Sequence, residues 1–207
     1  MGPVGFQTVT PLNGASRTGW RTSTGLYYDW AELVSIFHHQ DVLILGMGGG
    51  EMARVNHQAD PTNHITAVEK DERVVQLAKT HFSENLKGVE VIVGDAGKFV
   101  ESLRAKYDAI IVDVFDGMVI PENFYSFAFF SNVARCLSNW GAIIMNAAPI
   151  PLVATVGFTM KRAGFEPVTA FPVVNELQDT GSTIVWSTKS GNGISETISP
   201  AIPSHLK

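Results

Sequence analysis

Short apolar runs alternate along the chain with segments whose apolar residues recur at helical spacing. The run from Val42 to Leu45 is continuously apolar and ends at a glycine, as expected for a strand that is buried on both faces of a parallel sheet. Later segments contain similar short runs of mainly apolar residues. The predicted strands are 42–45, 64–69, 89–93, 107–113, 142–146, 165–171 and 182–187. Their alternation with helices predicts an α/β domain built on a mostly parallel sheet.

The same periodicity predicts the intervening helices. They are expected at 27–38, from Glu51, after a cap at Asp71, at about 97–105, at 121–137 and from the prolines at 149 and 151 to about 163. By contrast, the loop 175–181 is too short to hold a crossover helix. We therefore expect the last two strands to be antiparallel neighbours at the end of a seven-stranded sheet.

The composition is that of one globular domain with frayed ends. The chain has 207 residues, of which 45% are hydrophobic and 17% charged, enough to bury one sizeable core. Residues 1–25 are rich in Gly, Thr, Ser and Pro and hint at a hairpin remnant. Residues 26–189 are expected to form the Rossmann-like domain, and residues 190–207 a flexible tail.

The net charge and the cysteine content indicate which ligands and which cellular compartment to expect. The net charge is −5 and the pI is near 5.6, so the sequence does not indicate a positively charged surface for nucleic acid. A negatively charged protein accommodates cationic ligands more easily than anionic ones. Cys136 is the only cysteine, which excludes an intramolecular disulfide and fits the reducing cytoplasm. We expect no membrane span, because no apolar run approaches about 18 residues. We expect no metal site, because the histidines lack ligand spacing.

A glycine-rich turn follows the first predicted strand and opens a helix. Gly46, Gly48, Gly49 and Gly50 permit positive φ and a close approach of a ligand to bare backbone. The free N–H groups of the helix that begins at Glu51 would face such a ligand. These five residues therefore form a predicted nucleotide site. A glycine turn that serves only packing is the alternative.

Acidic residues end the second and third predicted strands. Glu69, followed by Lys70, lies 19 residues after Gly50 and can accept hydrogen bonds from both hydroxyls of a ribose. The alternative is a solvated strand end. Asp95, followed by Ala96, can accept from an adenine amino group, cap the next helix, or do both.

Asp113 ends the fourth predicted strand, and Asp116 lies in the loop after it. This pair is the candidate chemistry, and a turn-forming Asp-Gly is its alternative. Seven strands with a final hairpin and acids at the ends of strands two to four indicate the class I S-adenosylmethionine-dependent methyltransferase fold. A nicotinamide site is less favoured, because Glu51 stands where the dinucleotide fingerprint requires glycine.

Four segments resemble the polyamine aminopropyltransferases, the family of spermidine synthase. They are DVLILGMGGG, AVEKDERVVQLAKTHF, VIVGDA and YDAIIVDVFDG, in the family's order. The resemblance implies that Glu69 binds ribose, that Asp95 binds adenine, and that Asp113 and Asp116 hold the amine acceptor. It also implies S-adenosylmethionine or its decarboxylated form as co-substrate, and a small amine or polyamine as acceptor.

The chemistry of such a transfer explains the role of Asp113. An amine is protonated at neutral pH, with a pKa of about 10 as for lysine, and must lose a proton before it attacks the sulfonium carbon. A carboxylate attracts the ammonium and then accepts its proton. Because in-line attack requires alignment, much of the rate should come from positioning, without a covalent protein nucleophile.

The chain departs from the family at several positions. Gly49 stands where the family has an aspartate that holds the amine of the decarboxylated donor, and Glu51 is the candidate to replace it. The family's Tyr-His-Glu run corresponds to 27–29, Tyr-Tyr-Asp, and a family glutamine falls near Arg17. The family's amino-terminal β domain helps to form its dimer, and in this sequence we expect at most about 25 residues to correspond to it.

These observations support three hypotheses. The first is an aminopropyltransferase-like enzyme in the cytoplasm that uses S-adenosylmethionine or its decarboxylated form and an amine acceptor, with a homodimer left open. The second is a methyltransferase on the same scaffold. The third, from a different class, is a catalytically silent binder of an adenosyl ligand.

Overall fold

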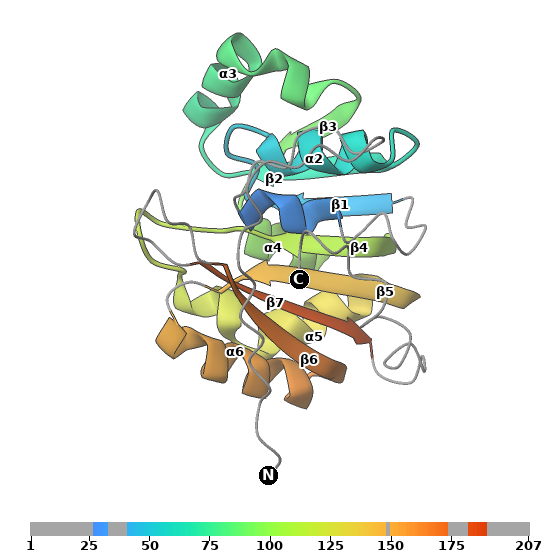
Figure 1. The fold of residues 1–207 in the computed structure, drawn as a ribbon, viewed down its shortest axis with the longest axis vertical. Helices are drawn as coiled ribbons and strands as arrows, with labels where there is room; N and C mark the ends of the chain where they lie inside the picture. Colours follow the sequence, from blue (N-terminus) through green and yellow to red (C-terminus); the bar gives the residue numbers. More distant parts are fainter. Residues whose placement is uncertain (1–26, 33–40, 148–149, 174–181, 190–207) are drawn as a thin grey trace.

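The computed structural model describes residues 27–32, 41–147, 150–173 and 182–189, which Figure 1 shows as a three-layered α/β domain. The strands are β1 Asp41–Leu45, β2 His64–Glu69, β3 Val89–Val93, β4 Tyr107–Val112, β5 Leu137–Asn146, β6 Phe165–Val173 and β7 Ser182–Lys189. They form one sheet in the order β3-β2-β1-β4-β5-β7-β6. Pairs from β3 to β5 are parallel, whereas β7 is antiparallel to both β5 and β6.

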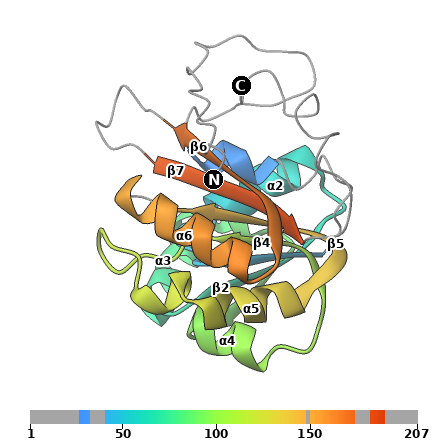
Figure 2. The same ribbon diagram turned by 90° about the horizontal axis from the view of Figure 1, so that it is seen from below.

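Helices cover both faces of this sheet. They are η1 Tyr27–Glu32, α2 Glu51–Ala59, α3 Glu72–His81, η2 Ser83–Leu86, α4 Ala96–Ser102, η3 Glu122–Tyr125, α5 Phe127–Cys136 and α6 Ile150–Arg162. Figure 2 shows α4 and α5 on the face opposite α2. Among the described helices, none is long and apolar enough to cross a bilayer.

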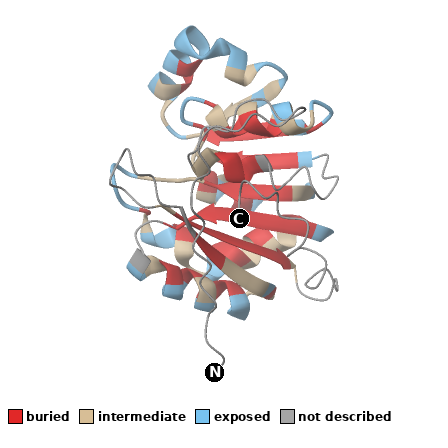
Figure 3. Ribbon diagram, in the orientation of Figure 1, coloured by how far each residue is buried: buried red, intermediate tan, exposed pale blue. Residues whose placement is uncertain are grey.

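Alternate side chains of β1 pack into two separate hydrophobic cores, one on each face of the sheet. Val42 and Ile44 pack in a core with residues of η1, α2 and α3, whereas Leu43 and Leu45 pack in a core with residues of α4, α5 and α6. All four side chains are buried, and the central strands are buried along most of their length in Figure 3. Burial on both faces accounts for the continuously apolar run.

The strand order reverses at β1, which positions the site. β1 pairs with β2 on one side and β4 on the other. In open α/β sheets, ligands bind outside the carboxyl ends of the strands at such a switch point. Leu45 is in register with both Val68 and Val112, so the residues that follow these three strands meet at one edge.

The predicted fold is confirmed, including the antiparallel arrangement of β6 and β7. Several boundaries were wrong. The segment expected as one helix at 121–137 is divided into η3 and α5, because the Ser126 hydroxyl accepts from Phe129 N and caps a new helix. The helix expected to reach 105 ends at Ser102, where Leu103 turns extended. β5 begins at Leu137, five residues earlier than expected, because it pairs there with Tyr107.

The amino-terminal part differs from the expected helix at 27–38. Only 27–32 is described, and it forms the 3-10 helix η1. The predicted hairpin at 1–25, the predicted hairpin loop at 175–181 and the tail at 190–207 lie outside the described residues.

Candidate functional site

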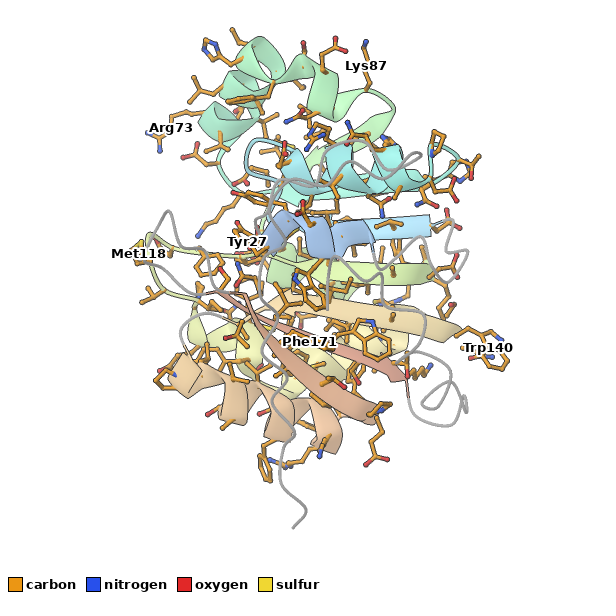
Figure 4. All side chains as sticks on the ribbon, viewed as in Figure 1. Tyr27, Arg73, Lys87, Met118, Trp140 and Phe171 are labelled. Carbon is orange, nitrogen blue, oxygen red and sulfur yellow. The ribbon has the colours of Figure 1, made fainter. Side chains whose placement is uncertain are left out.

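A pocket of about 820 Å³ lies at the carboxyl ends of the parallel strands. Many of the predicted site residues line it: Gly46, Gly48, Glu69, Lys70, Asp95, Ala96, Asp113 and Asp116. In Figure 4, Tyr27 and Met118 lie on the same side of the molecule, whereas Trp140, at the start of β5, lies on the opposite side. The structure therefore brings together acids that the sequence places at three separate strand ends.

The glycine turn allows two strand ends to approach closely. Gly46 has a φ of 88°, and a β-carbon there would lie 2.2 Å from the Asp113 carbonyl oxygen. Its N–H donates to Val68 O at 2.9 Å, and Asp113 N donates to Leu45 O at 2.8 Å. Any side chain at position 46 would force β1 and β4 apart. The glycine is thus required by close approach as well as by its φ.

Glu69 links the glycine turn to the turn after β2. Its Oε2 accepts a hydrogen bond of 3.1 Å from Gly48 N, and its Oε1 accepts one of 3.0 Å from Asp71 N. A carboxylate has about four acceptor positions. Each oxygen therefore keeps acceptor capacity for a ligand while the backbone fixes the orientation of the group.

Asp95 caps α4. Its Oδ1 accepts from Lys98 N at 2.9 Å, which satisfies one of the free N–H groups at the start of that helix. Its Oδ2 accepts no hydrogen bond from the part of the chain that the structure describes. The two roles predicted for this residue, helix cap and acceptor for a ligand, are therefore compatible.

Asp113 is held by two donors from distant elements. The Tyr27 hydroxyl donates to Oδ2 at 3.2 Å, and the Asn146 amide donates to Oδ1 at 3.1 Å. Burial raises the pKa of Asp113 to about 6, although the hydrogen bonds from Asn146 and Tyr27 act in the opposite direction. Burial and the Asp113 charge raise the pKa of Tyr27, so the phenol stays a donor. A carboxylate with these properties is ionised at neutral pH yet basic enough to accept a proton.

Asp116 lies in the exposed loop that forms another part of the pocket wall. It pairs with Val119 through the backbone, with Asp116 N donating to Val119 O at 2.8 Å. Met118, at the tip of this turn, is 80% exposed. The sequence interpretation of Asp116-Gly117 as a turn is thus correct, and it coexists with the position of Asp116 in the pocket lining.

Three predicted site residues do not line the pocket: Gly49, Gly50 and Glu51. Gly50 is the left-handed residue that precedes α2, with a φ of 79°. Glu51 forms an ion pair with Arg54, whose Nε lies 2.9 Å from Oε2. Arg54 therefore neutralises the carboxylate of Glu51, the predicted replacement for the family's aspartate.

Sequence reasoning missed several residues at the site. Tyr27 and Asn146 have no predicted role in the site, because the sequence pattern places Tyr27 only in the helix expected at 27–38 and Asn146 only at the end of the strand expected at 142–146. Asn123, Pro121 and Phe124 also line the pocket. A polar residue at the end of an apolar run was the available signal for Asn146, because parallel strands end at the same edge.

The pocket is predominantly acidic. Its lining includes the carboxylates of Glu69, Asp71, Glu72, Asp95, Asp113 and Asp116 but only two basic side chains, Lys70 and Arg73. Arg73 is already paired with Asp71 at 2.6 Å. This charge balance favours cationic ligands. Among the described residues, no group of three or more His, Cys, Asp or Glu side chains is arranged to hold a metal ion.

Comparisons with known proteins agree with these features. The family model of the spermine/spermidine synthase domain matches residues 31–174. Polyamine aminopropyltransferase 2 of Hyperthermus butylicus is 35% identical over 114 residues, which cover 51% of this chain and 37% of that protein. This chain thus spans well under half the length of that relative.

Solved structures support the same fold. The crystal structure of spermidine synthase from Thermotoga maritima has a TM-score of 0.71 at 16% identity, with 84% of this chain and 62% of that chain covered. Human methyltransferase-like protein 13 in complex with SAH has a TM-score of 0.64 at 21% identity, with 86% of this chain and 89% of that chain covered.

Proposed function

This chain belongs to the spermine/spermidine synthase domain family, and we propose that it is a transferase that moves an aminopropyl-type group to an amine acceptor. The donor is S-adenosylmethionine or its decarboxylated form. The position of Asp113 carries this proposal, because the residue lines the pocket with its backbone against Gly46 of the glycine turn, and its carboxylate is oriented by two donors.

Asp113 acts as the proton acceptor. The amine nitrogen attacks the methylene carbon bonded to the sulfonium sulfur, and a carbon–nitrogen bond forms as the carbon–sulfur bond breaks. The electron pair of the broken bond remains on sulfur, which leaves as a neutral thioether. The proton lost by the amine passes to Asp113, whose pKa of about 6 leaves most of the group ionised and ready at neutral pH.

The other acids bind the two cationic substrates. Glu69 accepts from the ribose hydroxyls with the acceptor capacity left free on its two oxygens, and Asp95 accepts from the adenine amino group. Lys70 and Ala96 complete the wall beside these two residues, and Gly46 and Gly48 offer bare backbone. Asp113 and Asp116 attract the ammonium groups of the acceptor, which is a small amine or a polyamine.

Product analysis tests this proposal. The protein is incubated with each of the two donors and a mixture of diamines and polyamines, and the products are identified by mass spectrometry. An amine that has gained an aminopropyl group from the decarboxylated donor, or a 3-amino-3-carboxypropyl group from S-adenosylmethionine, together with methylthioadenosine, supports the proposal. A methylated product would instead select a methyltransferase, and binding without turnover would select a silent binder.

The matched variant is Asp113→Asn, which keeps the size of the side chain and removes its basicity. Its neighbours remain satisfied, because the new amide oxygen can accept from Asn146 while its nitrogen donates to the Tyr27 hydroxyl. We expect this variant to bind the donor but to lose transfer by at least about a hundredfold, the usual contribution of a general base. Wild-type turnover in the variant would contradict the role of Asp113.

A further inference from the structure

Asn123 is a polar residue of the pocket that neither the motifs nor the acids account for. It lies on η3 and lines the pocket together with Asp95. A β-carbon built on Gly97 would lie 3.2 Å from Asn123 Nδ2 and 3.2 Å from Asp95 Oδ1. Both polar atoms therefore flank the same side of Gly97, and the absence of a side chain there gives them room.

The backbone of Asn123 is anchored although its side chain is exposed. Its carbonyl oxygen accepts from the Ser126 hydroxyl at 2.8 Å. The next residue, Phe124, is only 4% exposed and packs edge-to-face on Phe129 with ring centroids 5.2 Å apart. Core packing thus holds η3 in place, and the amide of Asn123 extends from a fixed point.

The side-chain amide of Asn123 is available to a ligand. Within the described residues it takes part in no hydrogen bond, whereas its carbonyl on the main chain is occupied. An amide nitrogen carries two donor protons, and the Asp95 carboxylate beside it is an acceptor only. A donor and an acceptor therefore lie side by side in the pocket wall.

That pair matches one edge of adenine. The 6-amino group of the base is a donor, and the ring nitrogens on either side of it, N1 and N7, are acceptors. We propose that Asn123 donates to one of these ring nitrogens while Asp95 accepts from the 6-amino group, so that the two residues together select adenine in the donor. This inference rests on the proposed function, because it assigns the pocket to an adenosyl ligand.

The pair would also reject other purines. Hypoxanthine has an oxygen at position 6, which would face the Asp95 carboxylate, and a protonated N1, which would face the amide donor if N1 is the contact. A site whose donors and acceptors meet a missing or reversed partner loses affinity strongly, because polar groups that the bound ligand covers are then left unpaired.

Binding of adenosine analogues that lack one ring nitrogen tests the proposed hydrogen bond from Asn123. Calorimetry with 5′-methylthioadenosine and its 1-deaza and 7-deaza forms, in which one ring nitrogen becomes C–H, is run on the wild type and on Asn123→Ala. We expect the wild type to bind one deaza form about fivefold more weakly, the scale of one neutral hydrogen bond. Asn123→Ala should bind methylthioadenosine about fivefold more weakly and should no longer distinguish that deaza form.

The matched control is Glu122→Ala. Glu122 is the exposed neighbour of Asn123 on η3 and does not line the pocket, so its variant should retain both the affinity and the discrimination of the wild type. Equal sensitivity to the deaza substitution in wild type and Asn123→Ala, or no sensitivity in either, would overturn the inference and leave the proposed function intact. A wild type that binds no methylthioadenosine would overturn both.

Discussion

Asn146 donates a hydrogen bond of 3.1 Å to Oδ1 of Asp113 across 33 residues of sequence. The register of the sheet explains this contact, because Val112 pairs with Met145 on the adjacent parallel strands. The residues that follow this pair, 113 and 146, are therefore neighbours at the same edge. Tyr27 completes the arrangement from η1 with a hydrogen bond of 3.2 Å to the second oxygen.

The first prediction concerns the proton affinity of Asp113. Asn146→Leu keeps the approximate size of a buried side chain and removes the donor to Oδ1. Because the hydrogen bond from Asn146 lowers the pKa of Asp113, its loss should raise that pKa above about 6. The rise in activity with pH should then shift upward by about one pH unit, since a hydrogen bond to a charged group contributes about 1.5–3 kcal/mol. The pH profile of kcat/KM measures this shift.

Tyr27→Phe provides the comparison for that profile. It removes the other hydrogen bond and should move the midpoint in the same direction, by less, because the effect of Tyr27 on this pKa is smaller than that of Asn146. A lower kcat/KM with an unchanged midpoint in both variants would show that these residues do not tune the carboxylate.

The second prediction concerns stability. Burial raises the pKa of Asp113 from 3.8 to about 6 in the folded state, so between these values the folded chain retains a proton that the unfolded chain releases. This group's contribution to stability is therefore fully present below about pH 4 and is lost as pH rises through about 6. Asp113→Asn removes the titration and should be more stable than wild type at pH 7 by up to about 3 kcal/mol.

Urea unfolding at two pH values measures this difference. The advantage of Asp113→Asn over wild type should shrink to below about 1 kcal/mol near pH 4, where the carboxyl group is almost fully protonated in the folded chain and about half protonated in the unfolded chain. A difference in unfolding free energy that is the same at pH 4 and pH 7 would contradict the assigned pKa. Loss of activity with a gain in stability is the pattern expected of a functional buried charge.

The third prediction concerns Glu69. Glu69→Ala should weaken binding of methylthioadenosine by about 1.5–3 kcal/mol, the scale of hydrogen bonds to a charged group. The loss combines the proposed ribose contacts with the hydrogen bond that holds Gly48 N in the turn. Calorimetry measures it, with Glu84→Ala as the control, because Glu84 is exposed and pairs only with Lys87 among the ion pairs of the described residues. Unchanged affinity in Glu69→Ala would remove the ribose assignment.

The sequence was informative where the site follows from local pattern. Apolar runs that end at an acid identify Glu69, Asp95 and Asp113 as strand ends, and the parallel order of the strands brings those ends together. The glycine turn was likewise visible, because Gly46 and Gly48 do have positive φ. The strand ends and the glycine turn could be predicted because each depends only on local hydrophobic periodicity and on the residue type at a single position.

The contacts made across the fold could not be predicted in the same way. Tyr27 reaches Asp113 over 86 residues from a 3-10 helix whose side chains do not follow the expected periodicity of 3.6. Asn123 depends on where η3 stops and α5 begins. The pairing of Glu51 with Arg54, three residues away, was the exception, since an i,i+3 ion pair on a helix can be recognised in the sequence.

The last prediction concerns the choice between the two donors. Gly49 stands where related sequences are expected to carry the acid that holds the donor's amine, and the ion pair with Arg54 occupies Glu51. Without a free carboxylate at the turn, a charge-assisted contact worth about 1.5–3 kcal/mol is missing. We therefore expect the wild type to discriminate only weakly between S-adenosylmethionine and its decarboxylated form.

Gly49→Asp should restore a preference for the decarboxylated donor by at least about tenfold. The turn can accept this side chain, because φ at Gly49 is not positive and a β-carbon there would meet the Phe82 ring at 3.7 Å, an ordinary contact. Gly49→Asn is the matched control, since it has the same size without the charge and should retain the wild-type ratio. Calorimetry with both donors gives the ratio for each protein. A wild type that already binds the decarboxylated donor a hundredfold more tightly would refute the prediction and assign the amine to another acid of the pocket.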